Sequence, residues 1–361
     1  MPGTPPRSLV PITAHARVDS DQMSELVRVV LSLVPVFLLL LALFALDSFK
    51  LVRASNLLRV IAAGAVIAVG CLLLARWVIA AGWFDKTTYL RYVAPVLEEA
   101  AKGLVVVHLI RTKRVGFMVD AAILGFATGA GFAAAENLYY LSTVSDANLL
   151  LWGVRGFGTA LLHGGATAIM GIVSKLLADL RGSESPFVFL PGLGIAVVSH
   201  VLFNSFYLSP VVFTLVLVST FPLLIFAVFA RSERILRDWL EVGLGSDVDL
   251  LDMLRSGEVK DTRVGRYVRT LRDRFPGEVL ADMLCYLQMS VELKIKAKGR
   301  LLMQEAGFAP HSDPAIADLF RELTFLEGSI GATGKLALGP FLHWSTRDLW
   351  GLRMLKESAS G

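Results

Sequence analysis

The side chains of this sequence that are best suited to chemistry lie inside its long apolar runs. Glu98 and Glu99 are adjacent in APVLEEAAKG, His163 lies in GTALLHGGATA, and His200 and Asn204 are four residues apart in VVSHVLFNS. A carboxylate and an imidazole can take a proton from water. A histidine and an asparagine at i and i+4 share one helix face, where both could donate hydrogen bonds to an oxyanion. A charge in the middle of a membrane helix costs about 2.5–3.5 kcal/mol, so each one requires a reason.

A second group of polar residues is expected to support the first. Lys102 is within one helical turn of both glutamates and can pair with either of them. The two glutamates are about 100° apart around a helix, so only one of them faces a given centre. The other supporting residues are Glu136, Asn137 and Arg155. We expect the Arg155 guanidinium to neutralise the Glu136 carboxylate.

Each group also has an ordinary structural interpretation. The glutamates with Lys102 could form an ion-pair cluster at a helix end. The His200–Asn204 pair could link two helices through hydrogen bonds. A lone buried histidine such as His163 is most often neutral and bonded to a neighbouring helix. Residue types and spacing alone leave these alternatives open.

The elements that must position these residues are membrane helices. Seven segments are apolar and long enough to cross a bilayer, given that about 20 residues are needed. They are 29–46, 57–81, 90–110, 117–141, 149–178, 187–208 and 211–230. In the fourth segment Gly125 and Gly129 form a GxxxG pair, which predicts close approach of another helix backbone.

Composition divides the chain into parts of different character. Hydrophobic residues make up 55% of the chain, beyond the average of soluble proteins. Residues 1–230 hold 16 basic and 12 acidic side chains, whereas residues 231–361 hold 19 of each. We therefore expect a mobile leader (1–28), a transmembrane bundle (29–230) and a soluble, cytoplasmic α-helical domain (231–361) with an unknown partner. The fold class is all-α, a polytopic bundle of about seven spans followed by a small helical domain.

Charge excludes one class of partner and indicates an orientation. The net charge of +4 is small and no basic stripe with aromatic residues occurs, so nucleic acid is not an expected partner. Basic residues gather in alternate short loops, after the first, third, fifth and last spans. Because basic loops stay in the cytoplasm, these loops and the C-terminal domain are predicted to be cytoplasmic.

Four motifs in order resemble one family. EEAAK, GAGFAAAENLYY, a histidine in the next span and HVLFN are similar to the PrsW family of intramembrane proteases, which is related to the type II CAAX prenyl endopeptidases. The resemblance covers about residues 90–208. It implies a glutamic-type endopeptidase in the bacterial cell membrane that cleaves a single-pass membrane protein within the lipid bilayer. An anti-sigma factor is the substrate that the resemblance suggests.

The resemblance also implies roles for the residues. One of Glu98 and Glu99, with Glu98 preferred, activates a water together with His163. His200 and Asn204 stabilise the oxyanion, and Glu136 and Asn137 fall on a supporting motif. No HExxH motif occurs, so we favour catalysis without a cofactor.

Three alternatives remain. Catalysis could instead require zinc or another divalent metal, whose ligands would be Glu98, Glu99, His163 and His200. The chain could be a non-catalytic scaffold or immunity protein of the same superfamily. It could also be a proton-coupled transporter, since acids and histidines in spans build proton relays, although we find no inverted repeat.

Overall fold

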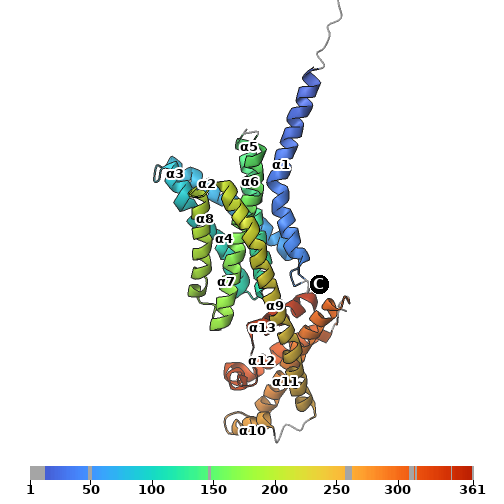
Figure 1. Ribbon diagram of the computed structural model, residues 1–361. Coiled ribbons are helices and arrows are strands. Elements are labelled where there is room, and N and C mark those ends of the chain that lie inside the picture. The colour runs from blue at the N-terminus through green and yellow to red at the C-terminus, as the bar shows by residue number, and fades with distance from the viewer. Residues whose placement is uncertain are drawn as a thin grey trace, which may run out of the picture.

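The computed structural model describes residues 13–47, 51–144, 148–256, 262–308, 313, 315–342 and 344–359, with side chains from residue 25 onward. Within these ranges the secondary structure is entirely helical, and no strand occurs. An apolar helix bundle occupies the upper part of Figure 1, and a smaller group of helices lies beneath it. The predicted all-α class is confirmed.

Six stretches of the described residues are long and apolar enough to cross a membrane, which makes the chain a multi-pass membrane protein. They lie in α1 (Thr13–Ala45), α2 (Ala54–Ala80), α5 (Met118–Thr143), the run from α6 (Leu149–Val154) through η2 (Arg155–Gly164) to α7 (Gly165–Arg181), the run from η3 (Pro186–Val188) to α8 (Leu190–Asn204), and α9 (Pro210–Arg255).

The seventh predicted span, 90–110, is not among these six. It is helical in the structure, as the π-helical turn η1 (Tyr89–Val93) followed by α4 (Ala94–Arg111), and the short helix α3 (Lys86–Thr88) precedes it. Its 18-residue helix carries four charged residues, Glu98, Glu99, Lys102 and Arg111, which is more than the other spans carry in their apolar windows. Glu99 and Lys102 are buried, because α4 packs against α2, α5, α7 and α8, whereas Leu104 on another face is exposed.

Helix α5 forms the centre of the bundle, and glycines let its neighbours approach closely. A Cβ atom added to Gly125 would lie 2.7 Å from the carbonyl oxygen of Thr167, and one added to Gly129 would lie 2.1 Å from the carbonyl oxygen of His163. On another face, a Cβ on Gly131 would lie 2.0 Å from the carbonyl oxygen of Ile61. The close approach predicted from the GxxxG pair is therefore confirmed.

The outer helices expose large apolar side chains. On α2 and α9 these include Val66, Leu73, Leu223 and Phe226, and on α8 Val198. Such a surface is what a lipid bilayer requires, because lipid tails solvate apolar side chains.

The helices beneath the bundle are α10 (Arg263–Thr270), α11 (Gly277–Glu305), α12 (Ala315–Leu338) and α13 (Thr346–Ala359), preceded by the lower half of α9. The predicted boundary at residue 231 falls inside α9, since neither Gly nor Pro interrupts residues 223–242. Likewise, residues 13–28 of the predicted leader are helical, because no Pro or Gly follows Pro11 until Pro35.

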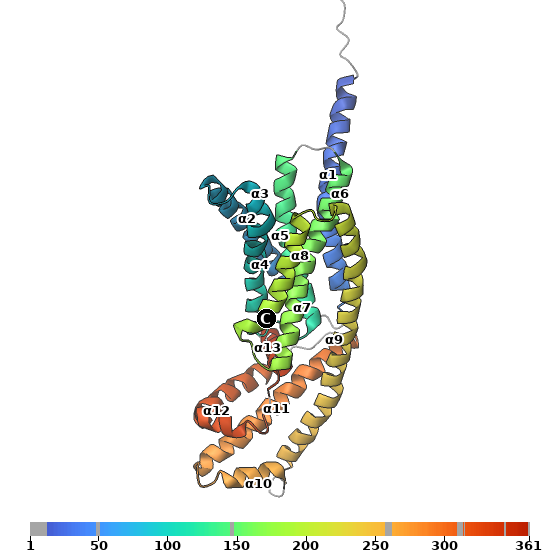
Figure 2. The same ribbon diagram turned by 60° about the vertical axis from the view of Figure 1, so that its left-hand side comes forward.

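Helix α13 joins the lower helices to the bundle, as both views show (Figure 1 and Figure 2). Trp350 is buried against Gly116, where an added Cβ would lie 2.5 Å from the indole ring. Thr346 Oγ1 donates a hydrogen bond to Asp179 Oδ1 at 3.0 Å, and Arg353 donates to the carbonyl oxygen of Thr112. Arg53, at the end of the first loop, lies 3.5 Å from Glu357 of α13, so the first, third and fifth loops lie at the same end of the bundle as the C-terminal helices. Their cytoplasmic location stays a prediction.

Candidate active site

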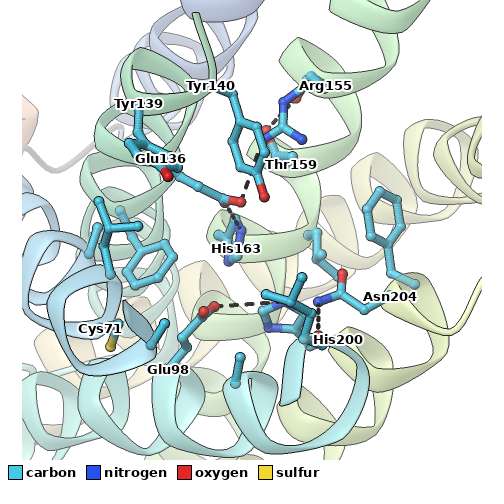
Figure 3. Close-up of a pocket in the computed structure, with 18 of the residues that line it drawn as sticks. Cys71, Glu98, Glu136, Tyr139, Tyr140, Arg155, Thr159, His163, His200 and Asn204 are labelled. Atoms are coloured by element: carbon cyan, nitrogen blue, oxygen red, sulfur yellow. Dashed lines mark hydrogen bonds and ion pairs between the residues drawn. The ribbon is translucent and has the colours of Figure 1, made fainter. Parts of the chain in front are cut away.

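A cavity of about 540 Å³ opens between α2, η1, α4, α5, η2 and α8. Six of the predicted site residues line it, drawn from four of these elements (Figure 3). They are Glu98, Glu136, Arg155, His163, His200 and Asn204. The other three predicted residues, Glu99, Lys102 and Asn137, are fully buried beside it.

The two adjacent glutamates have different surroundings. The side chain of Glu98 is 20% exposed and lines the cavity, with Oε2 3.8 Å from His200 Nε2. Glu99 is buried, and its Oε1 accepts hydrogen bonds from Lys102 Nζ at 2.6 Å and from His200 Nδ1 at 2.8 Å. Of the pair, only Glu98 is therefore in contact with the cavity.

The contacts of Lys102 determine the tautomer of His163. Lys102 Nζ lies 3.0 Å from His163 Nδ1, and an ammonium group can only donate hydrogen bonds. His163 Nδ1 must then be the acceptor, so its proton is carried by Nε2, which lies 2.8 Å from Glu136 Oε2. The chain Glu99–Lys102–His163–Glu136 thus links α4, η2 and α5 through hydrogen bonds.

Glu136 lies closer to the centre of the site than its supporting place in the sequence analysis suggests. Besides the hydrogen bond to His163, its Oε1 lies 3.4 Å from Arg155 Nη2. The Arg155 guanidinium carbon is 3.6 Å from the centre of the Tyr140 ring, a cation–π contact. The expected Arg155–Glu136 ion pair is present, and it holds the carboxylate that contacts His163.

Asn137 connects three elements next to the site. Its Nδ2 donates to the carbonyl oxygen of Ser32 at 2.8 Å and lies 3.2 Å from Thr159 Oγ1. Thr159 in turn donates to the carbonyl oxygen of Arg155. Asn137 therefore ties α1 and η2 to α5 and has no contact with the cavity.

His200 and Asn204 share a helix face, but their donors do not converge in this structure. Asn204 Nδ2 donates to the carbonyl oxygen of Leu90 at 3.0 Å, while His200 Nδ1 is directed at Glu99. His200 also contacts His163 and Glu98. Its ring centre lies 4.9 Å from that of His163, and its Nε2 faces Glu98.

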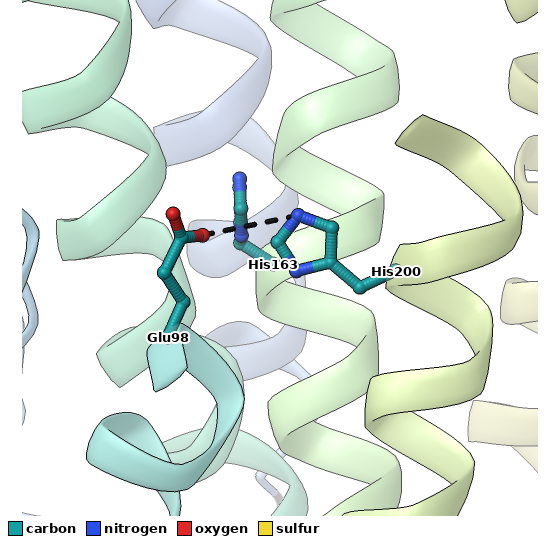
Figure 4. A group of neighbouring side chains, drawn as sticks. All are labelled: Glu98, His163 and His200. Atoms are coloured by element: carbon teal, nitrogen blue, oxygen red, sulfur yellow. Dashed lines mark ion pairs between the residues drawn. The ribbon is translucent and has the colours of Figure 1, made fainter. Parts of the chain in front are cut away.

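One carboxylate and two imidazoles gather in a way that could hold a metal ion. Glu98, His163 and His200 each offer one ligand atom, and these atoms lie within 4.8 Å of one another (Figure 4). Catalytic zinc sites use three protein ligands of this kind. The hydrogen bond from Glu99 to the other nitrogen of His200 is also typical of metal-binding histidines. The donor set therefore fits a metal, provided that His163 exchanges its contact with Lys102 or with Glu136 for the ion. Glu99, the fourth ligand predicted, is outside this group.

The sequence analysis did not single out three further residues that line the cavity, Cys71, Tyr140 and Thr159. For two of them a signal existed, because Tyr140 lies four residues after Glu136 and Thr159 lies four residues before His163. Cys71 lies in a uniformly apolar run, so its place at the cavity could not be predicted.

Comparison with known proteins agrees with this site. Residues 53–230 match the model of the PrsW family of intramembrane metalloproteases, a range that holds all nine predicted site residues. No curated protein and no solved structure matches the chain. The match favours a protease over a transporter, because the matched family is one of membrane-embedded hydrolases. We conclude that the membrane bundle of this chain, residues 53–230, belongs to the PrsW family of intramembrane proteases.

Proposed function

We propose that this protein is an endopeptidase that hydrolyses a peptide bond of a membrane protein in the cavity beside Glu98. One observation carries the proposal, namely that Glu98 lies beside two buried histidines, His163 and His200, and still lines the cavity. A carboxylate that can be reached from a cavity and is surrounded by imidazoles is suited to move protons.

In this proposal Glu98 takes a proton from the attacking water. The peptide carbonyl carbon accepts the hydroxide, and the proton then passes to the leaving nitrogen. Glu99 is a positioning residue, because its hydrogen bond to Nδ1 directs Nε2 of His200 toward Glu98. Glu136 has the same role for His163, because its Oε2 accepts a hydrogen bond from His163 Nε2 at 2.8 Å.

Glu98, His163 and His200 are the residues that would hold a metal ion. A bound zinc ion would supply a Lewis acid and make a water molecule more acidic. Metal-free catalysis by the same residues remains the alternative, and chelation distinguishes the two.

The oxyanion is assigned to Asn204 and, in the metal-free route, to His200 when its Nε2 carries a proton, since Nδ1 already donates to Glu99. Asn204 uses one N–H on the carbonyl oxygen of Leu90, which leaves its second N–H for a substrate oxygen. One well-placed donor of this kind contributes about 10²–10³ in rate.

The proposed substrate is a single-pass membrane protein, with an anti-sigma factor as the specific candidate, and the proposed location is the bacterial plasma membrane. Apolar side chains make up much of the cavity wall, among them Leu72, Leu151, Val154 and Leu162. Apolar residues on both sides of the cleaved bond would fit such a wall.

The test uses the full chain, purified and reconstituted in liposomes with single-pass transmembrane peptides that carry a fluorophore and a quencher. Glu98→Gln, His163→Ala and His200→Ala are expected to abolish cleavage. Glu322→Gln and His108→Ala are matched controls, since both residues are exposed and lie outside the cavity. Cleavage that survives all three site variants would overturn the proposal.

The same preparation tests for a metal. Loss of cleavage with a chelator, restoration by zinc and about one zinc per chain by elemental analysis would assign a metalloprotease. Cleavage unaffected by the chelator, with no metal in the purified chain, would assign the metal-free route.

A further inference from the structure

A second cavity, of about 800 Å³, lies where the C-terminal helices meet the membrane bundle. It shares no residue with the cavity at Glu98. On α2, the nearest lining residues of the two cavities are Arg59 and Ala68, so about 14 Å of helix separates them. The second cavity is therefore a separate site.

The charge of this cavity is strongly one-sided. Five basic side chains and one acidic side chain line it, namely Arg53, Arg59, Lys113, Arg353, Lys356 and Glu357. Glu357 lies 3.5 Å from Arg53 and accepts a hydrogen bond from Arg353 Nε at 2.9 Å, and Lys113 pairs with Glu184 outside the cavity. Even with Lys356 left out of the count, two carboxylates face four cations, which leaves an excess of positive charge.

Neighbouring residues increase this excess. Burial, and then the positive charge of Arg53, lower the pKa of the Arg300 guanidinium. Arg114 lines an adjoining small cavity together with Arg53, Lys113, Arg353 and Glu357. Its Nε is buried and has no hydrogen-bond partner among the described residues. An anion in the second cavity would relieve the repulsion among these cations.

An apolar wall from the C-terminal helices also lines the cavity, next to basic side chains of α13. Phe320 of α12 and Leu349 and Leu352 of α13 form it, and Lys356 Nζ lies 5.8 Å from the centre of the Phe320 ring. The basic wall begins at Arg53, directly before the first residue of the membrane helix α2. A ligand with an anionic group next to an apolar part would match both walls.

We propose that this basic cavity, lined by Arg53, Arg59, Lys113, Arg353 and Lys356, binds a phosphate group attached to an apolar moiety. Arginine and lysine are the usual partners of phosphate oxygens. Two sources share this chemistry, the headgroup of an anionic phospholipid and a soluble phosphate. Bound there, the ligand would bridge α2, the loop after α4 and α13.

The test titrates the full chain, in a non-ionic detergent, by calorimetry with three probes. They are phosphatidylglycerol with six-carbon chains, the matched phosphatidylcholine and inorganic pyrophosphate. Saturable binding of phosphatidylglycerol at least about fivefold tighter than phosphatidylcholine is expected for a lipid source, since one basic side chain near an anionic lipid contributes about fivefold. Saturable binding of pyrophosphate is expected for a soluble source.

The double variant Arg53→Gln/Arg59→Gln is expected to bind the anionic probe with about 25-fold lower affinity, because two cations are lost. Both side chains are exposed, so folding should be preserved, which thermal unfolding checks. Arg181→Gln, an exposed arginine outside the cavity, is the matched control and should bind like the unmodified chain. The proposal is overturned if neither anionic probe binds better than phosphatidylcholine, or if the double variant binds like Arg181→Gln.

Discussion

Glu99 and His200 are 101 residues apart in the sequence, yet Glu99 Oε1 accepts a hydrogen bond from His200 Nδ1 at 2.8 Å. Lys102 donates to the same oxygen, so this buried carboxylate holds a cation from its own helix and an imidazole from α8. The neighbouring Glu98 has no such partner and lines the cavity. The two adjacent glutamates therefore have different roles in our proposal: Glu99 positions His200, and Glu98 faces the substrate.

Glu98→Gln should stop cleavage and leave the fold intact. The amide cannot accept a proton from water, and loss of a general base lowers the rate by about 10²–10⁴-fold. The side chain is 20% exposed, and His200 Nε2 lies 3.8 Å from its Oε2, so the amide breaks no short hydrogen bond there. Cleavage assays and thermal unfolding measure the two effects separately, with Glu322→Gln as control.

Glu99→Gln should destabilise the protein as well as inactivate it. The change leaves the buried Lys102 ammonium without its counter-charge, and breaking a buried ion pair costs about 3–5 kcal/mol. His200 also loses the acceptor that orients it. A Glu99→Gln protein as stable as Glu98→Gln would contradict the different surroundings of the two carboxylates.

Gly129→Ala should disturb both the bundle and the site. Its new Cβ would lie 2.1 Å from the carbonyl oxygen of His163, so α5 and η2 must separate. Overpacking of this kind costs about 1–3 kcal/mol, and His163 would move away from Glu136. Gly153→Ala is the matched control, because nothing lies within 4 Å of its added Cβ. The prediction fails if both alanine variants unfold at the same temperature and cleave equally.

Much of the fold was predictable because membrane helices follow from length and apolarity alone. The exception was 90–110, which is helical but carries too many charges to stand out by apolarity, and which buries Glu99 and Lys102 against its neighbours while exposing Leu104. The boundary at residue 231 stays a prediction: charge density changes there, while helix α9 continues through it from Pro210 to Arg255.

The candidate site was predictable in its members but not in its connections. Spacing could place His200 and Asn204 on one face, yet not direct Asn204 to the carbonyl oxygen of Leu90, a contact across 114 residues. The central place of Glu136 was missed for a related reason. The segment from Arg155 to Gly164 is π-helical, and the wider turn alters the direction of His163 relative to an ordinary helix.

Arg155→Gln should lower the rate of cleavage without unfolding the bundle. Arg155 pairs with Glu136 and stacks on Tyr140, so it acts on His163 only through the Glu136 carboxylate. Losing a positioning partner of this kind typically costs about 10–100-fold. Arg155→Lys should recover little, because lysine lacks the planar group that stacks on the ring.

The readout for this prediction is the rate constant kcat measured beside KM, with Arg181→Gln as control. A decrease in kcat with an unchanged KM would support a role of Arg155 in positioning His163. Equal rates for Arg155→Gln and the control would contradict it.

Trp350→Ala should release the C-terminal helices from the bundle. The indole is buried against Gly116 and lies edge-on to Phe117 at 5.5 Å, so its removal leaves a cavity at the junction. Replacing a buried tryptophan with alanine costs about 3–5 kcal/mol. Limited proteolysis should then cut the region after α9 faster than in the unmodified chain. Trp83→Ala is the control, because that side chain is exposed. Equal cutting rates for the two variants would mean that α13 is held by its polar contacts with Asp179 and Thr112 rather than by the packing of Trp350.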